Sequence, residues 1–329
     1  MANPPITTVM SDNPATHTIR IGVSSCLVGQ EVRFDGGHKR NAFMLSNLSP
    51  YFEFVPYCPE VAIGMGVPRP PMRLVQRQDG VHAVGTRDPA LDNTEALRDY
   101  AFEVSGQLQA VSGYILKKDS PSCGMERVRV YDSNNVPART GSGIYAETLM
   151  QCHPDLPFEE EGRLMDPVLR ENFIERVFIY YRWQQLLRDG LTPSALVDFH
   201  SRHKFNVLAH DEPAYRRLGR LVADAGKEQL ESLAGRYIEI LMQALKKPAT
   251  RKQHTNVLMH VMGYLKASLD GDDKHELLEV LEKYRLGQVP LIVPITLIKH
   301  HLRKYPQPYI DQQYYMNPYP EELMLRNSL

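Results

Sequence analysis

Short apolar runs alternate with longer amphipathic stretches along the first half of the chain. The runs typical of strands occur at residues 18–25, 51–57 and 111–117. The stretches with a helical spacing of apolar residues occur at 41–49, 89–109 and 141–151. Strands that alternate with helices indicate a mainly parallel sheet joined by crossover helices. We therefore expect an α/β domain over residues 18–152.

Only helical periodicity follows in the second half. The predicted helices cover residues 168–189, 193–209, 213–225, 227–247, 250–269, 273–287 and 294–305. Prolines and an acidic triplet mark residues 153–166 as a linker, and we expect residues 167–329 to form an all-helical domain. We also expect a flexible tail over residues 1–17, and the Tyr- and Pro-rich residues 306–329 to lie extended against the surface of a domain.

The composition is that of an ordinary globular protein, and the number of cysteines favours one cellular compartment. The chain has 329 residues and a formal net charge of -1, so a nucleic-acid partner requires a local basic patch. No stretch approaches the roughly 18 apolar residues of a membrane span, and the first residues lack the pattern of a targeting signal. Four cysteines in so long a chain do not make a disulfide framework, which favours a reducing, cytoplasmic setting.

Three of the four cysteines follow predicted strands by a few residues. Cys26 lies in SSCLVG, Cys58 in PYCPEVAIGMGVPRPP and Cys123 in DSPSCG. Loops after the carboxyl ends of parallel strands gather on one edge of a sheet, so these three thiols can converge. Cys152 lies at the end of a predicted helix, and we interpret it as structural or incidental.

Three converging thiolates suit two kinds of metal centre. Zinc binds three cysteines plus a water or a histidine, and His38 and His82 are candidates for that histidine. A cubane iron–sulfur cluster held by three thiolates keeps one iron open, and the Cys58-Pro59 pair is similar to the ending of ferredoxin-type cysteine runs. Three unrelated core cysteines are the alternative, although the polar loop around Cys123 is unlike an apolar core.

Other reactive side chains accompany the cysteines. Glu60 follows Cys58 by two residues and can exchange a proton with a substrate or a water. Ser120 and Ser122 flank Pro121 and offer hydroxyls for hydrogen bonds. The candidates for substrate binding, from EVRFDGGHKR and GVPRPP, are Arg33, Asp35 and Arg69. Taken singly, Asp35 is equally well explained as a turn residue and Arg69 as a surface charge.

The motifs SSCLVGQEVRFDG, CPEVAIGMGVPRPP and KKDSPSCG together closely resemble the thiouracil desulfidase (TudS) domain family. The resemblance covers about residues 18 to 152 and implies a Rossmann-like α/β fold. The helical half, through KFNVLAH and TRKQHTNVLMHVMGYL, resembles the YbgA-like domain of the two-domain tRNA 4-thiouridine desulfidases (RudS).

The resemblance implies a cofactor, a set of roles and a reaction. The family holds a [4Fe–4S] cluster with three cysteines, which here correspond to Cys26, Cys58 and Cys123. Its catalytic glutamate and serine correspond to Glu60 and Ser120, with Ser122 as the second candidate. Phe34 stands where a tyrosine is more usual in the family, and an aromatic ring is kept. The implied reaction is non-redox: water replaces the sulfur of 4-thiouridine in tRNA, giving uridine and hydrogen sulfide.

Basic residues of the helical half are candidates for tRNA binding. They are Arg202, Lys204, Lys246, Lys247, Arg251 and Lys252. Each run alone is typical of a solvated helix face, but beside a domain that acts on a modified nucleotide, Lys and Arg suit phosphate contacts. No protein partner and no membrane are implied. Two other functions stay open: a desulfidase of free thiouracil bases with a structural helical half, and a non-catalytic or zinc-dependent RNA-binding protein.

Overall fold

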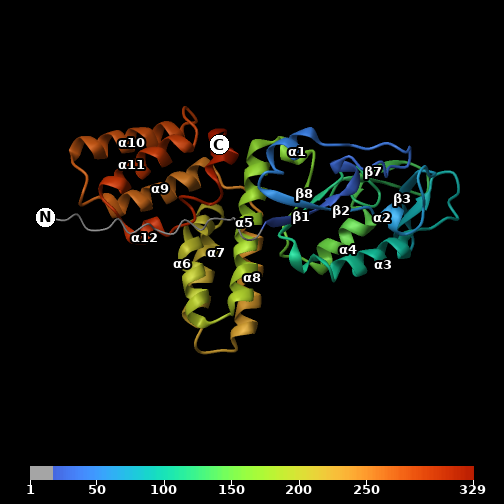
Figure 1. The fold of residues 1–329 in the computed structure, drawn as a ribbon, viewed down its shortest axis with the longest axis horizontal. Coiled ribbons are helices and arrows are strands. Elements are labelled where there is room, and N and C mark those ends of the chain that lie inside the picture. Colours follow the sequence, from blue (N-terminus) through green and yellow to red (C-terminus); the bar gives the residue numbers. More distant parts are fainter. Residues whose placement is uncertain (1–17) are drawn as a thin grey trace.

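The computed structural model describes residues 18–329, which form an α/β half and a helical half (Figure 1). The tail expected at residues 1–17 lies outside the described residues. The main sheet has four parallel strands in the order β2-β1-β5-β8. They are β1 (Ile19–Ser24), β2 (Phe52–Tyr57), β5 (Gly113–Leu116) and β8 (Phe158–Glu160). The expected fold class, a mainly parallel α/β domain followed by a helical domain, is confirmed.

Helices cover both faces of this sheet. They are α1 (Ala42–Asn47) and α5 (Pro167–Asp189) on one face, and α3 (Thr94–Ser105) and α4 (Ile144–Cys152) on the other. On the first face Ile21 of β1 packs in one core with Met44 of α1 and Val177 of α5. On the second face Tyr114 of β5 packs in another core with Tyr145 of α4. The sheet is therefore the middle of three layers.

A second, mixed sheet that the apolar pattern does not predict completes the α/β half. Its strand order is β4-β3-β6-β7. The strands are β3 (Met72–Arg77), β4 (Gly80–Gly85), β6 (Val128–Tyr131) and β7 (Pro137–Gly141). β3 and β6 run parallel, while β3–β4 and β6–β7 are antiparallel pairs. Leu74 and Val130 pack with Leu97 of α3 and Ile144 of α4, so one face of this sheet is buried on the helices.

The helical half contains two packed groups of helices. Besides α5 they are α6 (Pro193–His210), α7 (Glu212–Ala223), α8 (Leu230–Leu245), α9 (Arg251–Leu265), α10 (Gly271–Arg285), α11 (Ile292–Lys304) and α12 (Pro308–Asp311). α5 to α8 share one hydrophobic core, and α9 to α11 share another with the end of α6. Side chains of Asp166, Thr192, Asp211, Thr250 and Asp270 accept backbone hydrogen bonds at first turns, which explains why these helices begin where the sequence predicts. No helix within residues 18–329 has both the length and the apolar character needed to cross a membrane.

The segment expected as a linker, residues 153–166, contributes to the α/β core. It contains β8, which pairs with β5. The following helix α5 rests directly on the sheet, because a Cβ on Gly113 would lie 2.7 Å from Val177 Cγ2. Phe178 of α5 also contacts Phe52 of β2, with ring centroids 5.8 Å apart. A cut after residue 152 would therefore remove a strand and a covering helix from the sheet.

Residues 306–329 do not lie extended on the surface, contrary to the expectation from the sequence. They form α12 and short 3-10 turns, and Tyr315, Tyr319 and Leu325 are buried. Tyr319 packs in the core of β1 and α5, whereas Tyr315 packs with α9 to α11. The aromatic rings of this segment fill gaps between helices and strands. Because the segment itself is irregular, its buried residues show no helical or strand periodicity in the sequence.

Buried charges fix the C-terminal segment to α5 and α6. Glu175 of α5 lies 2.8 Å from the ring nitrogen of His210. One turn earlier, Glu171 accepts a hydrogen bond from the Tyr319 hydroxyl at 2.8 Å and lies 3.9 Å from Arg326 Nε. Although burial alone would raise it, His210 lowers the pKa of Glu175 to about 2. These opposite charges compensate one another in a region from which water is excluded.

Replacing Arg326 by methionine should destabilise the fold, because the buried carboxylates would lose a neighbouring cation. Removing one partner of a buried ion pair costs about 3–5 kcal/mol, and we expect a loss of this order in the free energy of unfolding. Urea denaturation followed by far-UV circular dichroism measures it. Arg303→Met is the matched control, because Arg303 is exposed on α11. Equal unfolding midpoints for the two variants would contradict this role of Arg326.

Candidate active site

Three cysteines line one cavity of about 380 Å³ at the carboxyl edge of the main sheet. Cys26 lies in the 3-10 turn directly after β1, and Cys58, after β2, is the N-cap of α2 (Pro59–Ala62). Cys123 lies in the loop after β5. Because β1 pairs with β2 on one side and with β5 on the other, the loops that follow these strands are neighbours. The structure thus brings together the three cysteines that the sequence singles out.

Hydrogen bonds and a close backbone approach hold the Cys123 loop in place. Ser120 Oγ accepts from the backbone N–H groups of Ser122 and Cys123 at 3.3 and 3.1 Å. The Gly124 N–H donates to the Ser120 carbonyl at 2.9 Å. Gly143, just before α4, passes so close that a Cβ there would lie 2.5 Å from the Ser122 carbonyl. The polar residues of this loop therefore form a stiff support that presents Cys123 to the cavity.

A buried ion pair fixes Glu60 in the same cavity. Arg69, with 2% of its side chain exposed, binds Glu60 Oε2 through Nε at 2.9 Å and also through Nη2. Ser122 Oγ donates to the other carboxylate oxygen, Oε1, at 2.6 Å. Arg69 further donates to the carbonyls of Gly66 and Val32, both at 2.8 Å. Arg69 is therefore a buried support for Glu60 and not a surface charge.

The two serines of the loop make different contacts. Their hydroxyl oxygens lie 3.0 Å apart, and both line the cavity. Ser122 is fully buried, where it bonds to Glu60 and lies 3.6 Å from Cys123 Sγ. Ser120 is only half-buried. Ser122 thus links the carboxylate to the cysteine loop, and Ser120 offers the hydroxyl that is more open to a bound molecule.

Burial raises the pKa values of the cavity thiols. The pKa of Cys26 rises to about 11, an effect that the charge of Lys117 only partly offsets. Burial also raises the pKa values of Cys58 and Cys123, and the carboxylate of Glu60 adds to the rise at Cys123. A thiol must lose its proton to bind a metal, so metal loading of this cavity at neutral pH releases protons.

The donor set fits a cluster better than a single ion. Within residues 18–329, no group of three or more His, Cys, Asp or Glu side chains is arranged to hold one metal ion. A four-iron cluster takes its thiolates on different iron atoms, and the three cysteines here come from three separate loops around one cavity. The described residues that line the cavity include no histidine. His38 instead accepts a hydrogen bond from the Arg40 N–H at 3.1 Å, and His82 lies between Asp79 and Asp92.

The remaining candidates around the cysteines lie at or beyond the rim of the cavity. Arg33 lines it together with Phe34. Asp35 does not line it: this residue is exposed and accepts a hydrogen bond from the Gly37 N–H at 3.1 Å, which agrees with a turn residue. Cys152 is exposed at the end of α4 and lies outside the cavity lining.

Several cavity residues are missed by reasoning from the sequence. They are Tyr57, Pro71, Met72, Lys117 and Lys118. Tyr57 directly precedes Cys58, and Lys117 lies in the same motif as Cys123. Their closeness to a cysteine in the sequence could have indicated that they line the cavity. Nothing in the sequence points to Met72, because it reaches the cavity from the unpredicted strand β3.

The cations expected to bind tRNA are mostly engaged within the helical half. Arg202 pairs with Asp198 at 2.8 Å, and Lys247 pairs with Asp211. Arg251 donates to two backbone carbonyls, both at 3.2 Å. The first contact lies within α6, whereas the other two join separate parts of the helical half.

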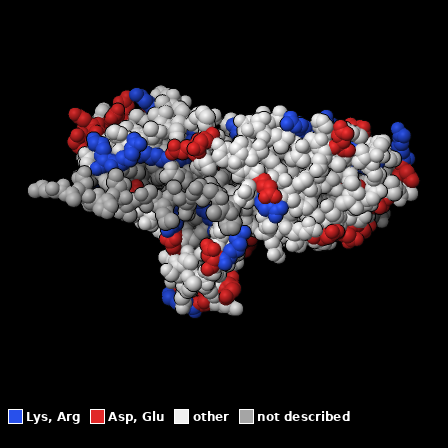
Figure 2. Space-filling model, in the orientation of Figure 1, with Lys and Arg blue, Asp and Glu red and all other residues white. Residues whose placement is uncertain are grey.

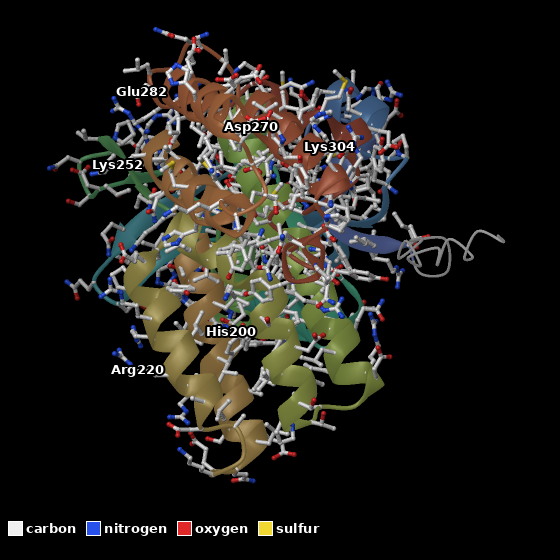
Figure 3. All side chains as sticks on the ribbon, turned by 90° about the vertical axis from the view of Figure 1, so that its left-hand side faces the viewer. His200, Arg220, Lys252, Asp270, Glu282 and Lys304 are labelled. Carbon is white, nitrogen blue, oxygen red and sulfur yellow. The ribbon has the colours of Figure 1, made fainter. Side chains whose placement is uncertain are left out.

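The other three cations stand apart from one another. Lys204 lies over the ring of Tyr309, 4.6 Å from its centroid, and Lys246 donates to the Pro154 carbonyl at 3.3 Å. Lys252 is exposed and has no ion-pair partner within residues 18–329. On the face shown in Figure 2, basic side chains gather in one group over the C-terminal helices and are bordered by acidic side chains, whereas the two charges are mixed over the helices that project below. In Figure 3, Lys252 on α9 lies well away from Arg220 on α7.

The two halves of the chain match different known families. Residues 21–161 match the family of 2-thiouracil desulfurases. Residues 204–320 match a family described as a protein of unknown function, DUF1722. The first match extends through β8, in agreement with the place of that strand in the main sheet.

Two proteins and one solved structure are similar to parts of the chain. The uncharacterized protein YbgA of Escherichia coli (strain K12) is 38% identical over 154 residues, which are 46% of this chain and 91% of YbgA. The uncharacterized protein YbbK of Bacillus subtilis (strain 168) is 29% identical over 138 residues, 40% of this chain and 89% of YbbK. The structure of a [4Fe–4S]-dependent thiouracil desulfidase, TudS, covers 45% of this chain and 94% of its own, with 29% identity and a TM-score of 0.37.

The match to YbgA has 38% sequence identity and extends over 91% of the length of that protein. The DUF1722 match lies in the helical half, and the desulfurase match lies in the half that holds the cysteine cavity. The chain therefore belongs to the YbgA family, and it joins a helical domain of that family to an N-terminal 2-thiouracil desulfurase domain.

Proposed function

We propose that this protein is a [4Fe–4S]-dependent desulfidase that replaces the sulfur of 4-thiouridine in tRNA by oxygen and releases hydrogen sulfide. The observation that carries the proposal is the cavity in which Cys26, Cys58 and Cys123 meet the fixed carboxylate of Glu60. The match of this half to the 2-thiouracil desulfurase family supports a thiocarbonyl substrate. Four cysteines in a chain of 329 residues do not make a disulfide framework, which supports action in the reducing cytoplasm.

The cofactor would be held by the thiolates of the three cavity cysteines. When bound, such a cluster supplies one iron without a protein ligand, a soft Lewis acid that suits a thiocarbonyl sulfur. The overall reaction consumes one water: the carbon–sulfur double bond becomes a carbon–oxygen double bond, and the sulfur leaves as hydrogen sulfide. No electron is gained or lost, so no redox partner is needed.

Glu60 is the group placed to move protons in this reaction. Its Oε1 and Oε2 atoms are held by Ser122 and Arg69, so the carboxylate has one orientation toward the cavity. In the proposed reaction Glu60 takes a proton from the attacking water and returns it to the departing sulfur. The half-buried hydroxyl of Ser120 holds the water or the substrate.

The walls of the cavity suit a pyrimidine ring. Phe34, Tyr57, Pro71 and Met72 supply apolar and aromatic surface for the flat base. Arg33 stands at the rim and can meet polar groups of the substrate. The same lining accepts a free thiouracil base, so a desulfidase of free bases remains the second candidate function.

Single substitutions of the cysteines test the cluster. We expect Cys26→Ala, Cys58→Ala and Cys123→Ala each to lose most of the iron, because each removes one of three protein ligands. Cys152→Ala is the matched control and should keep it, since Cys152 is exposed outside the cavity. Iron, sulfide and zinc contents of anaerobically purified protein are the measurements. Iron lost only from Cys152→Ala, or bound zinc in place of iron, would contradict the assignment.

Substitution of Glu60 by glutamine tests the proton transfer. We expect an iron-replete protein whose kcat falls by about 10²–10⁴-fold, the usual contribution of a positioned acid–base group. Glu31→Gln removes an equal charge from an exposed residue outside the cavity lining and should leave kcat unchanged. Steady-state release of sulfide from 4-thiouridine gives the rates. A wild-type kcat in Glu60→Gln would remove Glu60 from the mechanism.

Removing cations from the helical half tests the choice of tRNA over a free base. With Lys246, Lys247 and Lys252 replaced by alanine, the slope of log affinity for tRNA against log salt should be shallower by about 0.7–0.9 per lost phosphate contact. Desulfuration of free 4-thiouridine should be unchanged, because the cysteine cavity lies in the other half. A triple variant at Lys227, Lys266 and Arg303, all exposed, is the control for net charge. An unchanged tRNA affinity and slope would favour the free-base function.

A further inference from the structure

The second sheet presents a basic face to solvent. Its strands alternate, so that Leu74 and Val130 point into the core while their neighbours Arg73 and Arg129 stand on the opposite face. Arg139 of β7 lies directly across from Arg129 of β6 in the antiparallel ladder. Figure 1 places β3 and β7 at the end of the α/β half that faces away from the helical half. This face is therefore a surface separate from the cations of the helical half.

Only some of the arginines on this face have an acidic partner: Arg139 pairs with Asp119. Like charges directly opposite each other destabilise a sheet, as Arg129 and Arg139 do here. Within residues 18–329, Arg129 has no ion-pair partner. Arg73 lies 4.9 Å over the ring of Tyr131 and bonds only to the neutral side chain of Asn135. A basic sheet face that also carries an aromatic ring is typical of surfaces that bind single-stranded nucleic acid.

A charged hollow of about 300 Å³ connects this face to the active site. Lys118 and Asp119 line both the hollow and the cysteine cavity. Arg127 and Arg139 line the hollow as well, and Arg139 is also a residue of the sheet face. The stem of Lys118 rests on Gly162, where a Cβ would lie 2.8 Å from Lys118 Cδ. The hollow on the path from the cavity to the sheet is thus lined by the four cations Lys118, Arg127, Arg139 and Arg163, beside the acids Asp119, Glu126 and Glu160.

The acidic residues of the hollow are already engaged. Glu126 pairs with Arg163 at 2.7 Å, and Glu160 accepts a hydrogen bond from the Met125 N–H at 2.9 Å. Asp119 pairs with Arg139 at 2.8 Å, but both side chains are about half exposed, so this pair is weak and can open.

Two cations in the hollow are left without a counter-charge. Lys118 and Arg127 have no ion-pair partner within residues 18–329. Arg127 also has a left-handed backbone, with φ of 56°, which is uncommon for a residue other than glycine, and it lines this hollow. These features leave room for an anion from outside the protein.

We propose that Lys118, Arg127, Arg139, Arg129 and Arg73 form a cationic track that binds the phosphates of the RNA strand flanking the nucleotide in the active-site cavity. The inference rests on the proposed function, because it requires a nucleotide base in that cavity. Successive phosphates of one strand meet the hollow and then the sheet face, where Tyr131 offers a ring for a neighbouring base. A second copy of this chain is a poor occupant, since a symmetric contact would place arginines against arginines.

A double substitution on the track tests the proposal. The probe is a labelled RNA oligonucleotide that carries one 4-thiouridine, and its affinity for the cluster-loaded full chain is measured at several salt concentrations. In Arg127→Ala/Arg129→Ala we expect weaker binding and a salt slope shallower by about 1.4, that is roughly 0.7 for each of two lost phosphate contacts on a single strand. Arg127→Lys/Arg129→Lys keeps both charges and should keep the slope.

The matched control removes two exposed arginines from the helical half. Arg216→Ala/Arg236→Ala changes the net charge equally, on α7 and α8, and should leave the slope as in the wild type. Wild-type affinity and slope in Arg127→Ala/Arg129→Ala would overturn the proposal, as would equal losses in the two double variants. Altered inhibition by inorganic phosphate with unchanged RNA binding would also overturn it, in favour of a site for a small anion. Sulfide release from free 4-thiouridine by the wild type, measured in parallel, shows separately whether the proposed function itself holds.

Discussion

Parallel pairing of β1 with both β2 and β5 determines where the candidate active site of this protein lies. The three strands end at one edge, and the turn or loop that follows each of them carries a cysteine. Cys26, Cys58 and Cys123 thereby meet in one cavity although tens of residues separate them along the chain. β8 and α5 complete and cover the same sheet, so the beginning of the helical half also supports the site.

A buried pair of opposite charges, Arg69 and Glu60, lies at the cavity. A buried ion pair gains little net stability, because both charges lose their hydration. Arg69 nevertheless lies buried beside Glu60, where its remaining donors are satisfied by backbone carbonyls. The pair gives the carboxylate one fixed direction among thiols whose pKa values burial has raised. Such an arrangement suits the proton transfer and the metal cluster that we propose for this site.

The two halves present cations in different ways. In the helical half most of the basic residues considered for RNA binding are engaged by acids, carbonyls or aromatic rings of the same half. In the α/β half Lys118, Arg127 and Arg129 lack counter-charges within residues 18–329, and they follow a path that begins at the cysteine cavity. A long RNA could contact both halves, with the strand near the reacting base held by the α/β half.

Local features of the sequence were sufficient for the helices of the second half and for the three cysteines. Helix caps and a period of 3.6 residues are properties of neighbouring positions, as Asp166, Thr192 and Thr250 illustrate, and a cysteine after a strand is visible in the sequence itself. The second sheet, the burial of the C-terminal tyrosines and the partners of Glu60 were decided only by the tertiary structure. Ser122 and Glu60 are 62 residues apart in the chain, and nothing in either neighbourhood encodes their hydrogen bond. Contacts of this kind arise when packed elements meet, and a linear pattern of hydrophobic and polar residues carries no record of which elements do so.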